Sequence, residues 1–216
     1  NIRRKGEEFA KGVRVLTRGT LITPPVIGLL ATLGCSTPAC RNALRRAGTV
    51  RVYRKPRVAI IVTGNELRKP TESLSAGEIY DSNSFELSAA LQALGISSVL
   101  TLRVRDSKEK IRTAIKRALA KADVVISVGG VSVGEYDFVK EVCNDVGIKT
   151  EFWKVAIKPG KPNFFGTKGK KLFFGLPGNP VAALLSFHLL VRPALQKMMG
   201  RENASVLRLS AQMKAD

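Results

Sequence analysis

One glycine-rich segment has the composition of an anion-binding loop. It follows the apolar run Val124–Val128 and contains Gly129, Gly130, Ser132 and Gly134. Glycines leave the backbone bare, so amide N–H groups can approach an anion closely, and the serine adds a hydroxyl group. A helix that begins soon afterwards would add further donors and a partial positive charge. The alternative is a plain tight turn, since the spacing matches neither a dinucleotide-binding fingerprint nor a P-loop.

Three lysines lie within eight residues of one another in a second polar segment. Lys154, Lys158 and Lys161 fall on both sides of the pair Pro159–Gly160. Several ammonium groups on a short rigid turn suit a ligand that carries more than one negative charge. The alternative interpretation is a solvated basic loop without a ligand.

Three carboxylates, Glu66, Asp81 and Asp137, are expected near the same end of the fold as these basic segments. Carboxylates beside an anion site usually indicate a bound Mg²⁺ or a proton that must be held. We therefore predict catalytic roles for all three, and metal binding by Asp81 and Asp137. Asp81 could instead be a helix cap, because Ser82–Asn83 follow it.

A fourth segment, Gly175–Pro180, is a stiff loop that leads into a helix. Its residues Pro177, Gly178, Asn179 and Pro180 could bind an anion at the N-terminus of that helix. A structural turn with a helix cap at Asn179 explains the same residues equally well. The spacing alone does not choose between these two interpretations.

The cysteine and histidine content argues against several other chemistries. The chain has three cysteines and one histidine, without a Cys-x-x-Cys pair, so a zinc site is not expected. We interpret Cys35, Cys40 and Cys143 as idle thiols in a reducing, cytoplasmic compartment. His188 lies in an apolar helix, which favours a core or interface position over a catalytic one.

The elements that would position these segments alternate between strands and helices. The apolar runs Val58–Val62 and Val124–Val128 are typical of strands buried on both faces. Further elements are strands at 99–104 and 150–153, helices at 82–94, 107–121 and 136–146, a hairpin at 164–174, and a last helix, capped by Asn179, that should be buried to Leu190. This alternation predicts a three-layer α/β fold, a parallel sheet with helices on both faces. Because the four polar segments follow strands, we expect them to converge beyond the carboxyl ends of the sheet.

The chain is predicted to have four parts. These are a partial N-terminal β-containing unit at 1–48, a linker at 49–56, the α/β domain at 57–200 and the start of a truncated C-terminal β domain at 201–216. Within the first part, short strands are expected at Val13–Leu16 and Leu21–Ile22, before a helix that starts at Pro24–Pro25 and ends at Gly34. The chain begins at Asn1 without a methionine, and we interpret it as part of a longer protein.

The chain carries a large excess of positive charge. Its 216 residues include 36 Lys and Arg against 17 Asp and Glu, for a net charge of +19, and residues 1–57 hold 13 basic and 2 acidic residues. Such a field attracts phosphates, nucleotides or nucleic acid, although a surface adapted for solubility is an equally simple explanation. The longest apolar stretch, Val26–Leu33, is far shorter than the ~20 residues of a membrane span, which is therefore not predicted.

Five motifs, in this order, resemble the molybdopterin molybdenumtransferases, the family of MoeA and of the gephyrin E domain. They are TGNEL at 63–67, IYDSN at 79–83, GGVSVGEYD at 129–137, AIKPGKP at 156–162 and GLPGNP at 175–180. The resemblance implies a molybdopterin-binding α/β domain in a homodimeric enzyme. It implies that this enzyme inserts molybdenum from molybdate into adenylylated molybdopterin, with Mg²⁺ and release of AMP. The positions that the family uses at its site correspond to Glu66, Asp81, Asp137, Lys154, Lys158, Pro177 and Pro180.

Three other functions remain open from the sequence. The related molybdopterin adenylyltransferase shares the fold, but its glycine loop typically reads TGGTG, which residues 129–134 do not match. A non-catalytic scaffold or binding relative is the alternative from another class. A nucleic-acid binder would suit the net charge, but the basic residues lack interleaved aromatic residues, which argues against it. We therefore expect a pterin nucleotide as substrate and no nucleic acid.

Overall fold

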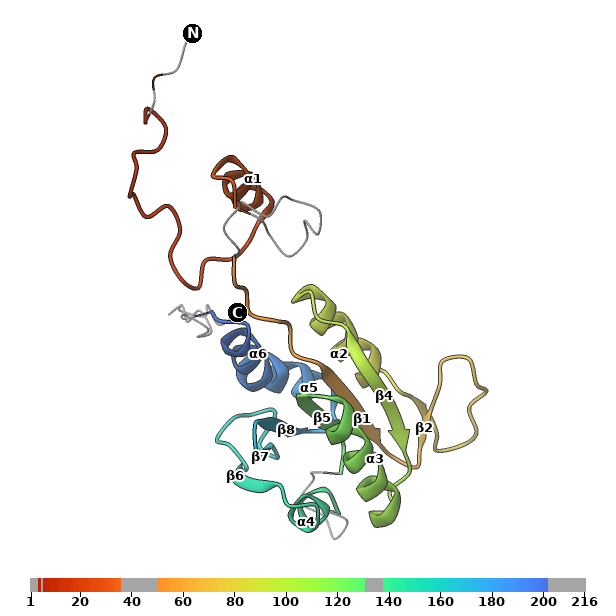
Figure 1. Cartoon of the computed structure of the whole chain (residues 1–216). Helices are drawn as coiled ribbons and strands as arrows, with labels where there is room; N and C mark the ends of the chain where they lie inside the picture. Colours follow the sequence, from red (N-terminus) through yellow and green to blue (C-terminus); the bar gives the residue numbers. More distant parts are fainter. Residues whose placement is uncertain (1–3, 5, 36–49, 131–137, 202–216) are drawn as a thin grey trace, which may run out of the picture. The chain divides into compact units, whose positions relative to one another are not determined.

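The computed structural model describes residues 4, 6–35, 50–130 and 138–201 (Figure 1). By its internal contacts the chain divides into two compact units. The smaller unit comprises Asn1–Arg54 with Gly200–Asn203, and the larger comprises Lys55–Met199 with Ala204–Asp216. All strands of the described residues belong to the larger unit.

The larger unit is built on a six-stranded sheet with the order β4-β1-β5-β8-β7-β6. Its strands are β1 (Val58–Thr63), β4 (Ser98–Val104), β5 (Val124–Val128), β6 (Lys149–Trp153), β7 (Phe164–Lys168) and β8 (Lys171–Leu176), and a separate small sheet pairs β2 (Leu67–Arg68) with β3 (Ile79–Tyr80). β1 runs parallel to β4 and β5, and β5 runs parallel to β8, whereas β7 is antiparallel to both of its neighbours. The predicted α/β class is confirmed, with β7 reversed in an otherwise parallel sheet.

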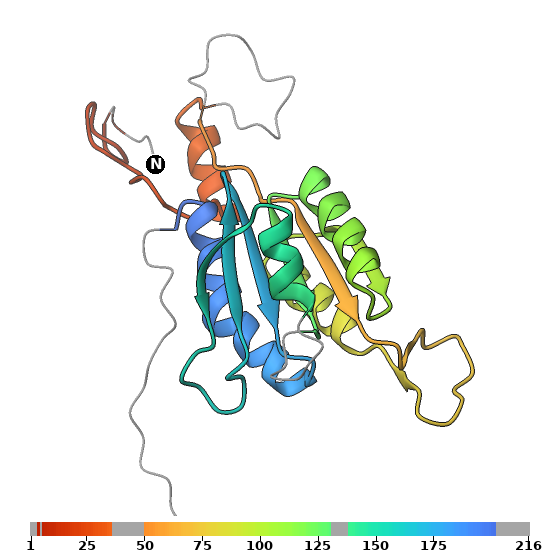
Figure 2. The same ribbon diagram turned by 90° about the horizontal axis from the view of Figure 1, so that it is seen from below.

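Helices cover both faces of this sheet (Figure 2). They are α2 (Asn83–Ala93), α3 (Lys108–Lys121), α4 (Phe138–Asp145), α5 (Pro180–Ser186) and α6 (Arg192–Met198), with the π-helical turn η1 (Phe187–Val191) between the last two. The helices predicted at 82–94 and 107–121 are confirmed, as is the described part of the one predicted at 136–146. No helix among the described residues is long and apolar enough to cross a membrane.

The alternation of side chains along β1 explains the three layers. Ala59 and Ile61 belong to the core under α3 and α4, whereas Val58, Ile60 and Val62 belong to the core under the other helices. All five residues are at most 1% exposed. A strand buried on both faces is therefore what the continuous apolar run specifies.

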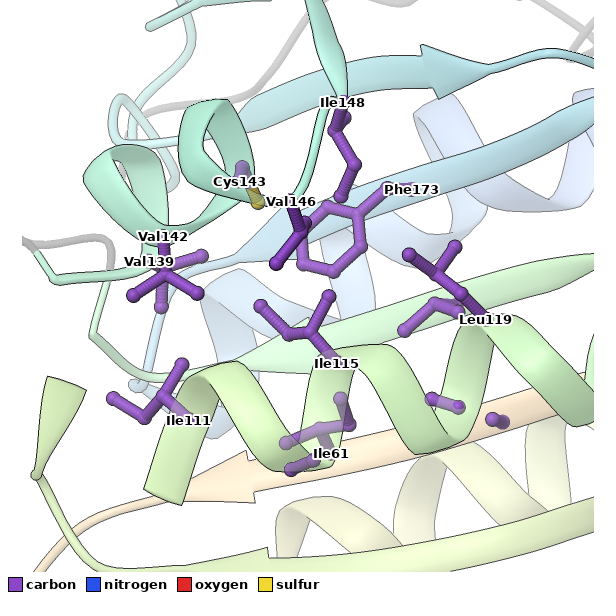
Figure 3. Packing of buried hydrophobic residues seen from close by; sticks show 14 of the residues in the cluster. Ile61, Ile111, Ile115, Leu119, Val139, Val142, Cys143, Val146, Ile148 and Phe173 are labelled. Carbon is purple, nitrogen blue, oxygen red and sulfur yellow. The ribbon is translucent and has the colours of Figure 1, made fainter. Parts of the chain in front are cut away.

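The core under α3 and α4 is closely packed (Figure 3). Ile111 and Ile115 of α3, Val142 of α4 and Phe173 of β8 are each at most 1% exposed within it. Burial of one such side chain contributes about 1.5–3 kcal/mol relative to leaving it in water. This packing fixes α4 and the strand ends that flank the glycine segment.

The carboxyl ends of four strands lie at the same edge of the sheet. The parallel register places Val62 of β1 beside Val128 of β5, and Val128 beside Leu176 of β8. β6 is antiparallel to β7, which is itself antiparallel to β8, so β6 runs in the direction of β8. The four polar segments therefore start from the same sheet edge, as predicted, although residues 131–137 of the glycine segment lie outside the described residues.

The start of α5 has the predicted cap, but the helix is not buried all round. Asn179 Oδ1 accepts a hydrogen bond from the backbone N–H of Ala182 at 3.2 Å, and Pro180 lies in the first turn. Val181 is 69% exposed and Leu189 is 36% exposed, so the expectation of complete burial is wrong. A helix in the outer layer of a three-layer fold packs only one face against the sheet, whatever its composition.

The smaller unit contains the helix α1 (Pro24–Thr32), which begins at the predicted proline pair and is followed by Gly34 with φ of +72°. The strands expected at Val13–Leu16 and Leu21–Ile22 are wrong, since residues 6–35 contain no strand. Val13 and Leu21 are more than half exposed, and nothing in the described part of this unit offers a strand to pair with them. The β domain expected to start at 201–216 lies outside the described residues beyond Arg201.

Candidate functional site

The glycine turn after β5 lies against the end of β1. Gly129 and Gly130 have φ angles of +84° and +65°, in the left-handed region that glycine adopts without strain. A Cβ atom on Gly129 would stand 2.5 Å from the backbone oxygen of Thr63, so the turn has no room for a side chain there. Gly129 also donates its N–H to the carbonyl oxygen of Leu176 at 3.2 Å. The turn therefore joins the ends of β1, β5 and β8.

The loop Gly175–Pro180 is a direct neighbour of this glycine turn. A Cβ atom on Gly178 would lie 3.7 Å from the Cα atom of Gly129. Asn83, at the start of α2, donates from its side-chain amide to the carbonyl oxygen of Gly178 at 2.9 Å. The structure thus brings two of the predicted binding segments together and fixes one of them to α2.

The loop that carries the three lysines has a buried anchor. Lys154 has a φ angle of +67°, and its backbone N–H donates to the carbonyl oxygen of Asn163 at 2.7 Å. Asn163 is fully buried, and its side-chain amide donates to the hydroxyl oxygen of Ser186 in α5 at 3.0 Å. Lys154, Lys158 and Lys161 themselves are exposed. The loop therefore presents three ammonium groups to solvent from a fixed backbone.

Trp153, at the end of β6, brings two lysines together. The Nζ atom of Lys140 in α4 lies 3.8 Å from the centroid of the indole ring, and that of Lys154 lies 4.3 Å from it. Both distances are within the range of cation–π attraction. The sequence analysis missed Trp153 and Lys140, because their contact arises only when α4 packs beside β6. The available signals were the tryptophan directly before Lys154 and a lysine in the first turn of a helix after a glycine segment.

Asp81 is 2% exposed and caps α2. Its Oδ1 accepts the backbone N–H of Ser84 at 3.0 Å, and its Oδ2 accepts the Ser84 hydroxyl at 2.6 Å and Nη2 of Arg103 at 3.0 Å. These three bonds occupy most of the lone-pair positions of the carboxylate. In this arrangement Asp81 supports the first turn of α2 and does not fit a magnesium ligand.

Glu66 and Asp106 place two carboxylates close together beyond the ends of β1 and β4. Glu66 is exposed, and Asp106 donates its backbone N–H to the side-chain oxygen of Asn65 at 3.2 Å. Burial raises the pKa of Asp106 above its ordinary value, and the negative charge of Glu66 raises it further. The sequence analysis missed Asp106, which belongs to none of the motifs.

A cavity of about 760 Å³ opens beside Asp81. Its lining includes Arg68, Phe85, Arg103 and Arg105, and none of the described residues that line it belongs to the glycine turn or to the lysine loop. The cavity therefore adjoins the α2 and β4 side of the sheet edge, whereas the lysines face solvent farther along the edge.

Three predicted site residues, Ser132, Gly134 and Asp137, lie outside the described residues, and their roles stay predictions. Within the part of the chain that the structure describes, no group of three or more His, Cys, Asp or Glu side chains could hold a metal ion. Glu66, the remaining predicted catalytic residue, lies near Asp106, whereas the carboxylate oxygens of Asp81 are bonded to Ser84 and Arg103.

Comparison with known proteins gives the class of this fold. Residues 59–197 match the family described as "Probable molybdopterin binding domain". The match covers more than half of the chain and includes all six strands of the main sheet except the first residue of β1. The chain belongs to this family of molybdopterin-binding domains.

Individual relatives of this chain carry the name of a particular enzyme. The chain is 41% identical over 202 residues to the molybdopterin molybdenumtransferase of Haemophilus influenzae, across 94% of this chain and 47% of that protein. It is 37% identical to the enzyme of the same name from Bacillus subtilis, across 94% of this chain and 44% of that protein. The resemblance to molybdopterin molybdenumtransferases expected from the motifs is confirmed. The chain spans about half the length of the curated relatives that it matches.

Solved structures agree with this placement. The molybdopterin biosynthesis MoeA protein of Pyrococcus horikoshii superimposes with a TM-score of 0.77 at 34% identity, over 93% of this chain and 47% of that one. A structure of molybdenum cofactor biosynthesis protein B gives a TM-score of 0.55 at 21% identity, over 69% of this chain and 96% of that one. The second similarity shows a shared fold alone.

Proposed function

We propose that this chain is the pterin-binding part of an enzyme that inserts molybdenum from molybdate into adenylylated molybdopterin and releases AMP. The observation that carries the proposal is the contact between the glycine turn and the Gly175–Pro180 loop, at the same sheet edge from which the lysine loop leaves β6, in a member of a molybdopterin-binding family. The named relatives favour this activity over an adenylyltransferase or a scaffold.

The residues of this edge have distinct roles in the proposal. Lys154, Lys158 and Lys161 bind the phosphate groups that join the pterin to AMP. The glycine turn, with Ser132 and Gly134, lets the backbone approach these phosphates, and the stiff loop of Pro177, Gly178, Asn179 and Pro180 closes the other side. When the bond to AMP breaks, negative charge grows on the phosphate oxygens, and ammonium groups already in place stabilise it.

The carboxylates take the remaining roles in this proposal. Glu66 and Asp137 act at the reacting groups, whereas Asp81 acts through α2, whose first turn it holds. The proposal includes a requirement for Mg²⁺, which proteins commonly bind through substrate phosphates and one or two carboxylates. Asp137 remains the candidate ligand for this ion. We further propose a homodimeric enzyme in the cytoplasm that does not bind nucleic acid.

Substitution of the lysines tests the binding part of the proposal. Lys154→Ala and Lys158→Ala should each weaken the binding of adenylylated molybdopterin by about 1–3 kcal/mol, the range for charge-assisted hydrogen bonds. Titration calorimetry at low and high salt measures this, and the loss should shrink at high salt because the lysines are exposed. Lys116→Ala, an exposed lysine of α3, is the matched control. Unchanged affinity in the double variant would contradict the proposal.

Substitution of Asp137 tests the catalytic part. Asp137→Asn keeps the shape of the side chain and removes its charge. We expect normal folding and pterin binding, with AMP release slower by about 100-fold or more, as for loss of a charge-stabilising group. The assay supplies molybdate, Mg²⁺ and adenylylated molybdopterin to the full-length enzyme. AMP release at the wild-type rate would show that Asp137 is not catalytic.

A further inference from the structure

The indole ring of Trp153 contacts two ammonium groups that come from different elements. Lys154 follows β6 directly, whereas Lys140 lies in the first turn of α4. Their Nζ atoms lie 4.3 Å and 3.8 Å from the same ring centroid. The two Nζ atoms are therefore separated by no more than these distances taken together, about 8.1 Å.

Neither of these ammonium groups forms an ion pair among the described residues. Their acidic neighbours in the sequence, Glu141 and Glu151, are paired with other lysines. Two like charges at this separation repel each other, and the negative face of the ring offsets only part of that repulsion. An anion that contacts both lysines would offset the repulsion that remains between their ammonium groups.

A phosphate group suits this arrangement. A hydrogen bond from an ammonium group to a charged oxygen spans about 2.8 Å, so two such bonds to different oxygens of one phosphate or pyrophosphate can bridge two nitrogens up to about 8 Å apart. In addition, the indole N–H of Trp153 is buried and has no hydrogen-bond partner among the described residues.

We propose that Lys140 is a second phosphate-binding cation of this site, and that Trp153 is the positioning residue that holds Lys140 and Lys154 together. The pair selects ligands in which two or more negative charges lie close together, such as a pyrophosphate group. This inference rests on the proposed function, because it adds a residue to the same binding site. The left-handed φ angle of Lys154 turns the chain out of β6 directly after Trp153, at the position of the proposed site.

The chain contains a single tryptophan, which makes Trp153 a reporter of its own site. Titration of the 216-residue chain with inorganic pyrophosphate should change the tryptophan emission, because the bound anion changes the charge beside the indole ring. Calorimetry of the same titration gives the affinity. Lys140→Ala should weaken pyrophosphate binding by about 10-fold or more, the loss of one charge-assisted hydrogen bond, whereas Lys140→Arg should retain most of it. Lys116→Ala on α3 is again the control and should change neither signal.

Variants of Trp153 separate positioning from simple stability. Trp153→Phe keeps an aromatic ring and should lose less pyrophosphate affinity than Trp153→Leu, which removes the cation–π attraction. A merely structural role would lower the unfolding temperature of both variants without this order of affinities. The inference is overturned if Lys140→Ala binds pyrophosphate as tightly as the wild type, or if the wild type does not bind it.

The two proposals can fail separately in these experiments. If Lys140-dependent pyrophosphate binding is found but adenylylated molybdopterin does not bind, the anion site stands and the proposed function is wrong. If adenylylated molybdopterin binds and Lys140→Ala leaves its affinity unchanged, the proposed function stands and Lys140 has no part in it.

Discussion

At the scale of single residues, Asp81 and Lys154 differ in how much of each side chain is left for a ligand. The carboxylate of Asp81 is buried and already accepts three hydrogen bonds. Lys154 is exposed, and its ammonium group lies over the indole ring of Trp153 without an ion pair among the described residues. Asp81 therefore shapes the site through α2, whereas the ammonium group of Lys154 is available for a ligand.

Removal of the Asp81 carboxylate should destabilise the fold. Asp81→Ala leaves Arg103 and the Ser84 groups without their acceptor, and the free energy of unfolding should fall by about 3 kcal/mol, as when one partner of a buried ion pair is removed. Urea unfolding measures this loss. Glu109→Ala, which removes an exposed carboxylate from the first turn of α3, is the control and should cost far less. If Asp81→Ala unfolded like the wild type, the capping role would be wrong.

The pKa of Asp106 predicts a pH dependence of stability. Burial raises this pKa above 3.8, the ordinary value, so the folded protein holds the proton to higher pH than the unfolded chain does. Stability attributable to Asp106 therefore falls as the pH rises from 3.8 to the raised value, and stays reduced above it. Asp106→Asn should raise the unfolding temperature near neutral pH. It should have no such effect at about pH 3, where the Asp106 carboxyl is protonated in both the folded and the unfolded protein. Equal shifts in thermal unfolding at both pH values would contradict this.

At the scale of elements, the glycine turn is the part of the site that tolerates change least. Gly129 and Gly77 both have φ angles of about +80°, but a Cβ atom would meet the Thr63 oxygen at 2.5 Å in the first case and nothing within 4 Å in the second. Gly77→Ala should cost about 1 kcal/mol for the backbone conformation alone. Gly129→Ala should cost about 2–4 kcal/mol, because the turn must also move away from β1. Urea unfolding of the two variants compares them, and equal losses would show that the close contact is unimportant.

The fold was predictable from the sequence where a periodic pattern was long enough. The continuous apolar run of β1 and the helical spacing in α3 each specify an element and its buried faces. β2 and β3 have two residues each, too few to show any period, and they were missed. The strands expected at Val13–Leu16 failed for the opposite reason: an apolar pattern was present, but the described part of its unit supplies no partner strand.

The sequence predicted only those features of the candidate site that follow from the order and direction of the strands. Parallel strands bring their carboxyl ends together, so the glycine turn and the Gly175–Pro180 loop could be placed side by side without any structure. The contact between Lys140 and Trp153 and the ion pair between Asp81 and Arg103 depend on side-chain packing between separate elements. No local pattern encodes such pairs, and so neither was foreseen.

At the scale of the whole molecule, the net charge of +19 should make stability depend on salt. Exposed ion pairs such as Lys108–Glu141 each contribute only about 0–1 kcal/mol and weaken in salt. The repulsion among excess positive charges acts over the whole surface, and it is also screened as the Debye length falls from about 30 Å at 0.01 M to about 8 Å at 0.15 M. We expect the repulsion to dominate, so the unfolding temperature should rise with sodium chloride over this range. A fall would show that the ion pairs matter more.

The position of β8 between β5 and the reversed strand β7 has a consequence for the order of folding. β7 and β8 form a hairpin closed at Lys168 and Lys171, a local contact of the kind that forms within microseconds, whereas β1 must find β5 across a crossover. During synthesis, which proceeds from the N-terminus, β1 and β5 exist before the chain that contains β8 has been made. The hydrogen bond from Gly129 to Leu176 can form only after β8 has been made. The ribosome must therefore complete β8 before the glycine turn can take its final shape, so the nascent chain cannot form its binding edge from β1 and β5 alone.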